Sequence, residues 1–296
     1  DYPIRIKPEK QVLALDDVIG RDSRGLRLAV AGRLHGSTPQ AVYQAMCSLF
    51  LQPKRALLVD DYTNREGGVF PKYRFGDAAA ILDRRLDVTH LTGDQVAAAQ
   101  LQRLRENAAP FGMLWLNSSG GSRSFALRGP GGQPADLPAG YPTAYYVVHS
   151  FSAQHPDNPG TIGGRALHNG AYWYFGSVHE PYLHAFVRPT GLAVKAMAGT
   201  PLAAAARHTP GHPMHRPWKL MLVGDPLFTL RDEPAERVDV GLPEGVAKVA
   251  VDADDPPARQ FRDALLSGAD GGADQAAEHV QRGEELLSGD LRSAAW

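Results

Sequence analysis

Cysteine is almost missing from this chain: Cys47 is the only one among 296 residues. A single thiol excludes an internal disulfide and any cysteine-based zinc cluster. The chain also lacks an excess of charge, since its formal net charge is -1, so no overall field favours nucleic acid or an anionic membrane. No run approaches the ~18 apolar residues of a membrane helix, and no signal-peptide pattern is found. We therefore expect neither a nucleic-acid partner nor a membrane span.

Hydrophobic residues are present in the amount that a packed core requires, at 43% of the chain. Apolar runs typical of strands alternate with segments of helical spacing. The expected strands cover residues 25–31, 55–61, 88–91, 111–116, 145–148, 171–175 and 218–223. The expected helices cover residues 38–50, 77–86, 92–107, 161–169, 181–198 and 201–207. This alternation predicts an α/β fold: a three-layer α/β/α sandwich around a mostly parallel central sheet.

Composition divides the chain into three parts. Residues 1–24 have no clear period, and because the chain begins at Asp1 without Met, we expect a lead-in that follows a missing upstream region. Residues 25–232 form the expected α/β domain, with a long loop at 120–142 that is rich in Gly and Pro. Residues 233–296 form a linker and a small helical tail, with helices expected at 259–266 and 274–287.

The most informative stretch joins the two expected strands at 145–148 and 171–175. Each strand stops abruptly at polar residues: His149 and Ser150 follow the first, and Ser177, His179 and Glu180 follow the second. In open α/β sheets the chemistry gathers at the carboxyl ends of the strands. Ser150 needs a base to become a nucleophile, and its neighbour His149 points to the opposite face of a strand. Either both side chains satisfy hydrogen bonds at the strand end, or a base such as His179 serves Ser150.

The strand at 111–116 is followed by a polar turn, Asn117-Ser118-Ser119-Gly120-Gly121. Glycine allows backbone N–H groups to converge, so this turn could hold an oxyanion. It could equally be a plain exit from the strand, which we favour. Glu180 precedes Pro181, so it caps the positive end of a helix or forms a wall of a binding cleft.

Two other groups of side chains carry metal-ligating atoms. Asp60 and Asp61 end a strand and could bind a divalent cation, or be solvated and paired with arginine. His208, His212 and His215 have helical spacing, but the prolines between them forbid a regular helix. A zinc site there would need further ligands, so a His-rich loop is the favoured interpretation. The phosphate-binding Gly-x4-Gly-Lys spacing is missing, and we predict no metal and no cofactor.

Four segments together resemble a known family. They are GRLHGST (32–38), LVDDYT (58–63), GGRALHNGAYWYFGSVHEPYLHAF (163–186) and WKLMLVGDPLF (218–228). They resemble the gingipain-like branch of caspase-fold proteins, in particular a bacterial family with a GS-x-x-EP segment and a terminal GDPL segment. The resemblance spans roughly residues 25 to 230 and implies a caspase-like fold.

The resemblance also implies where a catalytic dyad would lie. In active members a His follows one strand and a nucleophilic Cys follows the next; these strands correspond to residues 112–116 and 144–148. The His position falls in 117–120, which contains no His, and the Cys position falls at His149 or Ser150. Cys47 lies on an apolar helix face in the first third of the chain, where a buried thiol is usually inert. Both members of the dyad are therefore absent.

These observations predict a degenerate caspase-fold domain, related to peptidases but without cysteine peptidase activity. It would bind an unknown peptide or protein in a cleft built from residues 117–121, 149–152 and 176–181. The alternative is a serine-type hydrolase that uses Ser150 with a His base, while backbone groups of Gly120 and Gly121 hold the oxyanion. A third hypothesis is a metal-binding domain that uses the late histidines. The resemblance suggests an exported, periplasmic or extracellular protein.

Overall fold

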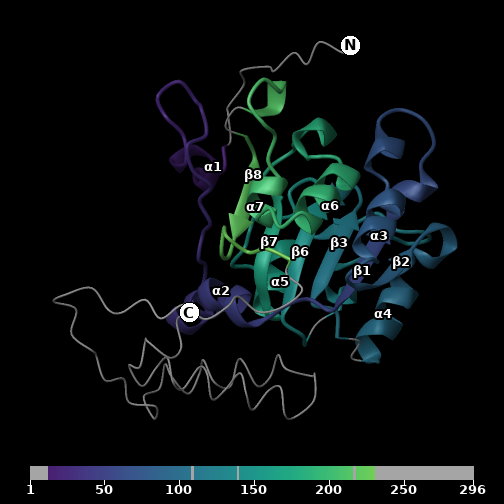
Figure 1. Ribbon diagram of the computed structural model, residues 1–296. Helices are drawn as coiled ribbons and strands as arrows, with labels where there is room; N and C mark the ends of the chain where they lie inside the picture. The colour runs from purple at the N-terminus through teal and green to yellow at the C-terminus, as the bar shows by residue number, and fades with distance from the viewer. Residues whose placement is uncertain (1–12, 108–109, 139, 216–217, 231–296) are drawn as a thin grey trace, which may run out of the picture.

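A six-stranded sheet forms the centre of the protein (Figure 1). The computed structural model describes residues 13–107, 110–138, 140–215 and 218–230. In spatial order the strands are β2 (Asp87–Leu91), β1 (Arg55–Asp60), β3 (Met113–Asn117), β6 (Thr143–Val148), β7 (Ala171–Ser177) and β8 (Leu220–Val223). The first five are parallel, and β8 is antiparallel to β7. The predicted α/β fold with a mostly parallel sheet is confirmed.

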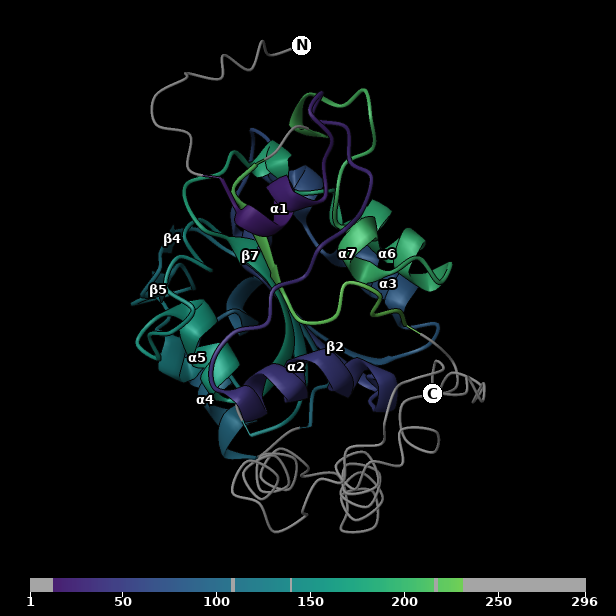
Figure 2. The ribbon, with the colours of Figure 1, turned by 90° about the vertical axis from the view of Figure 1, so that its left-hand side faces the viewer.

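Helices pack on both faces of this sheet, as Figure 2 shows. Side chains of α2 (Thr38–Phe50), α3 (Gly76–Leu82), α6 (Pro189–Met197) and α7 (Leu202–Ala205) form one apolar cluster with the sheet. Side chains of α4 (Ala98–Glu106) and α5 (Ile162–His168) form the other. Cys47 of α2 is buried in the first cluster. The arrangement is consistent with three layers, and no helix of the described segments is long and apolar enough to cross a membrane.

Strand β1 shows that side chains are buried on both faces of the sheet. Ala56 and Leu58 belong to one cluster and Leu57 and Val59 to the other, and all four are fully buried. Successive side chains of a strand point to opposite faces, so a strand covered on both sides reads as one continuous apolar run. The runs at 55–60, 145–148 and 171–175 have this property, which explains why they were predictable.

Two expectations about secondary structure were wrong. The segment 25–31 is not a strand, because no neighbouring strand pairs with it, and Leu28 is 75% exposed. The helix expected at 181–198 begins only at Pro189, because proline fixes the helical φ at that first position and keeps Arg188 extended. The segment before it holds only the 3-10 turn η5 (Leu183–Ala185).

The other differences concern loops and ends. The helix expected at 92–107 starts at Ala98, after the 3-10 turn η3 (Gly93–Gln95). The loop at 120–142 contains the short antiparallel strands β4 (Gly120–Gly121) and β5 (Ser124–Phe125) and the 3-10 turn η4 (Pro134–Asp136). The helices expected at 259–266 and 274–287 lie outside the described residues.

A strap formed by residues 13–34 covers the free edge of β8. It contains the short helix α1 (Leu15–Ile19). The Arg33 N–H donates to Leu222 O at 3.0 Å, and Gly224 N–H donates to Arg33 O at 2.8 Å. Unpaired strand edges invite pairing with other chains, so the strap closes this edge of the sheet.

Two buried carboxylates fasten the strap. Asp17 accepts from the Trp218 N–H at 2.7 Å, and Asp16 accepts from the Leu222 N–H at 2.8 Å. Four guanidinium groups surround these carboxylates, those of Arg21, Arg27, Arg33 and Arg207. Burial raises the pKa of Asp16. Burial acts in the same direction on Asp17, but the arginines and the Trp218 N–H together hold its pKa below the usual value.

Candidate functional site

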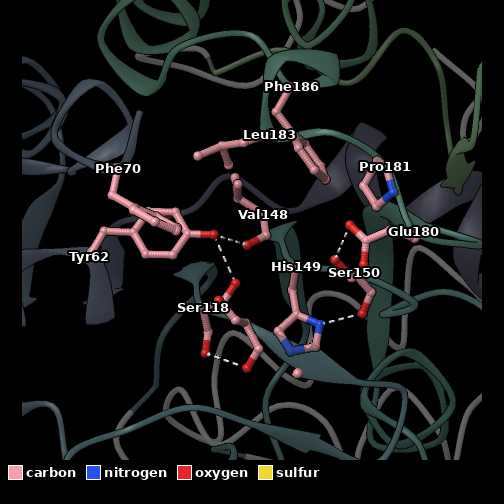
Figure 3. A pocket seen from close by; sticks show the side chains of 12 residues that line it. Tyr62, Phe70, Ser118, Val148, His149, Ser150, Glu180, Pro181, Leu183 and Phe186 are labelled. Carbon is pink, nitrogen blue, oxygen red and sulfur yellow. Dashed lines mark hydrogen bonds between the residues drawn. The ribbon is translucent and has the colours of Figure 1, made fainter. Parts of the chain in front are cut away.

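A pocket of about 270 Å³ opens at the carboxyl ends of β3, β6 and β7 (Figure 3). The parallel register places Asn117 beside Val148, so the polar residues after β3 and β6 lie next to one another. Six of the sequence-predicted site residues line this pocket: Ser118, Ser119, Gly120, His149, Ser150 and Glu180. The structure therefore brings together residues from three strand ends, as the sheet topology requires.

The remaining walls are apolar, and apart from Pro181, which belongs to the predicted cleft segment 176–181, they were not anticipated. They consist of Tyr62, Phe70, Val148, Pro181, Leu183 and Phe186. Tyr62 belongs to the 3-10 turn η1 (Asp61–Asn64), and Phe70 begins η2 (Phe70–Tyr73). The two rings meet edge to face, with centroids 5.1 Å apart. The only sequence signal was that aromatic residues follow a strand that ends in two aspartates.

His149 forms part of the floor of the pocket and is 2% exposed. Its Nδ1 lies 2.5 Å from the backbone oxygen of Ser150, which can only accept, so Nδ1 carries the proton. Its Nε2 is buried and has no hydrogen-bond partner among the described residues. Burial lowers the pKa of His149 to about 4, so the ring is neutral at pH 7.

The absence of a side chain at Gly120 leaves the space that the His149 ring occupies. The φ of Gly120 is +147°, a region that is open essentially to glycine alone. A Cβ at this position would lie 3.1 Å from His149 Nε2 and 2.5 Å from the carbonyl oxygen of Ser124. The ring therefore occupies space that a side chain after β3 would otherwise require.

Ser150 and Glu180 form a pair at the rim. The Ser150 hydroxyl donates to Glu180 Oε1 at 2.9 Å. No basic side chain in the described segments forms an ion pair with the Glu180 carboxylate. The nearby Lys219 Nζ donates to the Glu180 backbone oxygen. Glu180 is exposed, and Figure 3 shows its side chain beside the pocket. The rim thus carries the negative charge of the Glu180 carboxylate, which is available to bind a ligand.

Asn117 lies below the pocket and is fully buried. Its Nδ2 donates to Asp60 Oδ1 at 2.7 Å and to the Tyr73 carbonyl at 2.9 Å, and its Oδ1 accepts from the Tyr62 N–H. The other oxygen of Asp60 accepts from the Phe75 N–H at 2.5 Å. Asn117 therefore positions the chain that carries Tyr62 and contributes no group to the pocket.

Ser177 and His179 also lie outside the lining. Ser177 is fully buried, and its N–H donates to Ser152 Oγ at 3.1 Å while its hydroxyl donates to the His179 carbonyl. The His179 ring packs on Phe151, with centroids 5.1 Å apart. Phe151 has φ +59°, the only positive value at a non-glycine residue within the described ranges. These residues shape the turn after β6 and do not contact the Ser150 hydroxyl.

Arg65 lies beside the aromatic wall. Its guanidinium carbon is 5.5 Å from the Tyr62 ring centroid and 5.0 Å from that of Phe70. Its Nη2 pairs with Asp61 Oδ2 at 2.9 Å. Burial is the main reason that the pKa of Tyr62 is raised, and its hydroxyl donates to Ser118 O at 2.8 Å. The aromatic wall is therefore fixed by its own hydrogen bonds and cation–π contacts.

The side chains described offer no group of three or more His, Cys, Asp or Glu that could hold a metal ion. Asp61 is paired with Arg65, and Asp60 is bonded within the protein. The rings of His208 and His212 stack on each other, with centroids 3.8 Å apart. This geometry does not direct their nitrogens towards a common ion.

The chain was compared with protein families, curated proteins and solved structures. No protein-family model matches the chain, and no curated protein or solved structure matches it. What the fold and the site define together is an α/β protein with a half-apolar pocket at its strand ends.

Proposed function

We propose that this chain is a caspase-fold module that has lost its catalytic dyad and binds a peptide segment in the strand-end pocket. One observation carries this proposal. At the two adjoining strand ends, the resemblance expects a His within residues 117–120 and a Cys at His149 or Ser150, and neither segment contains the expected residue. The His149 ring lies against Gly120 instead. The only cysteine of the chain, Cys47, is buried in α2, and burial raises its pKa well above the usual value. No thiolate is therefore available at the pocket.

The contacts of Ser150 favour binding over serine-type hydrolysis. A serine nucleophile needs a basic nitrogen within hydrogen-bond reach. The Ser150 hydroxyl donates to Glu180, whereas His149 Nδ1 meets the Ser150 backbone oxygen. His149 is also neutral and turned with its free Nε2 towards Gly120. These contacts give the pocket polar groups for recognition without an activated hydroxyl.

The lining points to the chemistry of the ligand. Apolar walls suit the hydrocarbon part of a side chain, and the Glu180 carboxylate at the rim suits a positive head group. Tyr62 and Phe70 already carry the Arg65 guanidinium on their rings, so they add apolar surface to the pocket and not a further site for a cation. We therefore propose that the pocket receives a lysine or arginine side chain of a peptide or protein partner.

A matched pair of small probes tests this proposal. Benzamidine carries a positive charge and benzamide is its neutral counterpart, so binding of both is measured by NMR titration of the full chain. We expect benzamidine to bind at least about tenfold more tightly, which corresponds to about 1.4 kcal/mol, and Glu180→Gln to remove that preference. Glu66→Gln, a change of an exposed carboxylate outside the lining, is the control. Equal binding of the two probes, or an unchanged preference in Glu180→Gln, contradicts the proposal.

Covalent labelling separates the two classes of function. A fluorophosphonate probe reacts with activated serines, so the native chain is compared with Ser150→Ala and with a heat-denatured sample. We expect no stoichiometric labelling of the native chain between pH 6 and pH 9. Labelling that disappears in Ser150→Ala would establish the hydrolase instead.

A further inference from the structure

One wall of the pocket is a short segment, residues 181–187, whose carbonyl groups are held by side chains. The Tyr73 hydroxyl donates to Phe186 O and the Tyr146 hydroxyl donates to Val187 O, both at 3.2 Å. On the outer side, His208 Nε2 lies 2.9 Å from His184 O. Burial raises the pKa of Tyr73 to about 12 and that of Tyr146 further still. Of these three donors, only His208 can change its charge between pH 4 and pH 8.

His208 is bonded in its neutral form to the wall and stacked on a second neutral histidine. A carbonyl oxygen only accepts, so His208 Nε2 carries the hydrogen towards His184 O. The His212 ring lies parallel to it, with an interplanar angle of 3° and centroids 3.8 Å apart. His212 Nδ1 accepts from the Met214 N–H at 3.0 Å. Protonation of His212 at Nδ1 therefore breaks that bond.

Every titratable side chain that faces this pair is basic. His184 of η5 and Lys195 of α6 act on the pair electrostatically. His215, in the 3-10 turn η6 (Pro213–His215), lies 2.9 Å through Nδ1 from the His208 carbonyl. No Asp or Glu is paired with any of these histidines in the parts of the chain described. Among side chains, a proton added to the cluster thus meets only like charge, whereas the backbone oxygens of His184 and Phe186 favour the protonated ring; burial and the basic side chains outweigh them, because the pKa of His208 is lowered overall.

We propose that the stacked His208 and His212 are an acid-sensitive clamp, which holds the 181–187 wall of the pocket at neutral pH and releases it on acidification. Leu183 and His184 then lose their fixed positions while Tyr73 and Tyr146 still hold Phe186 O and Val187 O, and the pocket loses its ligand. This role rests on the proposed binding function of the same pocket, whereas the release of the wall does not.

The direction of the pH effect follows from the cluster. Burial, followed by the charge of His212, lowers the pKa of His208 to about 4, and burial also lowers that of His212. The released state binds protons more readily than the clamped state, so the clamp is complete above pH 6.5 and weakens as the pH falls towards 4. Within that window each pH unit shifts the equilibrium by up to about tenfold per group.

Hydrogen exchange tests the clamp without any ligand. The amides of Ala185 and Phe186 donate to Tyr182 O and Leu183 O at the wall, and their protection is measured in the full chain at pH 7.0 and 4.5. We expect protection to fall by about tenfold or more at pH 4.5 after correction for intrinsic exchange rates. His208→Gln keeps a donor without a titrating ring, so its protection falls clearly less than that of the wild type, with His212 as the remaining titrating ring. The control is His155→Gln, an exposed histidine on another loop, which keeps the acid response.

A second variant and a second readout complete the test. His212→Asn keeps an acceptor for Met214 but removes the stacked charge that lowers the pKa of His208, so the acid response becomes smaller. The benzamidine dissociation constant, measured at pH 7.0 and 5.5, rises with acidity more in the wild type than in His208→Gln. Equal acid responses of the wild type and both variants, or constant protection in the wild type, would overturn the clamp. Absent benzamidine binding with an intact exchange response contradicts only the proposed function.

Discussion

Replacement of Gly120 by alanine tests the arrangement at the floor of the pocket most directly. The new Cβ would lie 2.5 Å from a backbone oxygen of Ser124 and 3.1 Å from His149 Nε2. The backbone oxygen belongs to the β4–β5 hairpin and cannot turn away. A non-glycine residue at φ +147° costs about 1–3 kcal/mol, and crowding of a packed site costs about 1–3 kcal/mol more. We expect Gly120→Ala to lower the free energy of unfolding by about 2–6 kcal/mol.

The neighbouring glycine provides the control. A Cβ on Gly121 meets nothing within 4 Å, and its φ is not positive, so Gly121→Ala is expected to change stability by less than about 0.5 kcal/mol. Urea unfolding, followed by tryptophan fluorescence, measures both. In the double variant Gly120→Ala with His149→Ala, part of the loss is recovered, because the smaller side chain vacates the contested space. Equal stabilities of Gly120→Ala and Gly121→Ala would refute the packing of His149 against Gly120.

Three further predictions concern stability and reactivity. Asp17→Asn leaves the surrounding guanidinium groups without their buried counter-charge, and we expect it to lower the free energy of unfolding in urea by about 3–5 kcal/mol. The control is Asp94→Asn, whose carboxylate is 84% exposed and whose loss costs less than about 1 kcal/mol. Similar losses in both variants would contradict the role of Asp17 in holding the strap. The pKa of His149, about 4 in the folded state, lies below its unfolded value of 6.5, so unfolding free energy increases with pH between 4 and 6.5 by up to about 3 kcal/mol. His149→Gln should flatten that slope, and an unchanged slope argues against a buried neutral ring. Cys47 is 2% exposed, so the native chain should react with Ellman's reagent only at the rate of its unfolding, and immediate stoichiometric reaction would show that the thiol is accessible.

The central strands and the edge that carries the site were predictable because their signal is local. Strands covered on both faces are continuous apolar runs, and the polar residues that stop them mark the carboxyl edge. His149, Ser150 and Glu180 were placed in this way, and they line one pocket. The segment 25–31 shows the limit of this signal. Its apolar pattern resembles that of a strand, but pairing depends on a neighbour that the segment itself does not specify.

The apolar walls could not be derived from pattern alone. Tyr62 and Phe70 belong to 3-10 turns, and Leu183 lies in another, so none belongs to a periodic apolar face. Their meeting depends on how the connections after β1 and β7 fold over the sheet. The orientation of His149 depends in the same way on Gly120, a residue of another strand end. Long-range contacts of this kind leave no trace in the local sequence.

The strap over β8 ties the beginning of the described chain to its end, and this has a consequence for synthesis on the ribosome. Asp17 and its backbone partner Trp218 are 201 positions apart. At about 5–20 residues per second, the early segment waits on the order of 10–40 seconds for its docking site to be made. Until then the two buried carboxylates, Asp16 and Asp17, lack the backbone N–H groups of Leu222 and Trp218 that they bind in the native state. The strap can therefore dock only after β8 has been made, and a nascent chain released before residue 223 cannot complete the sheet of the described residues.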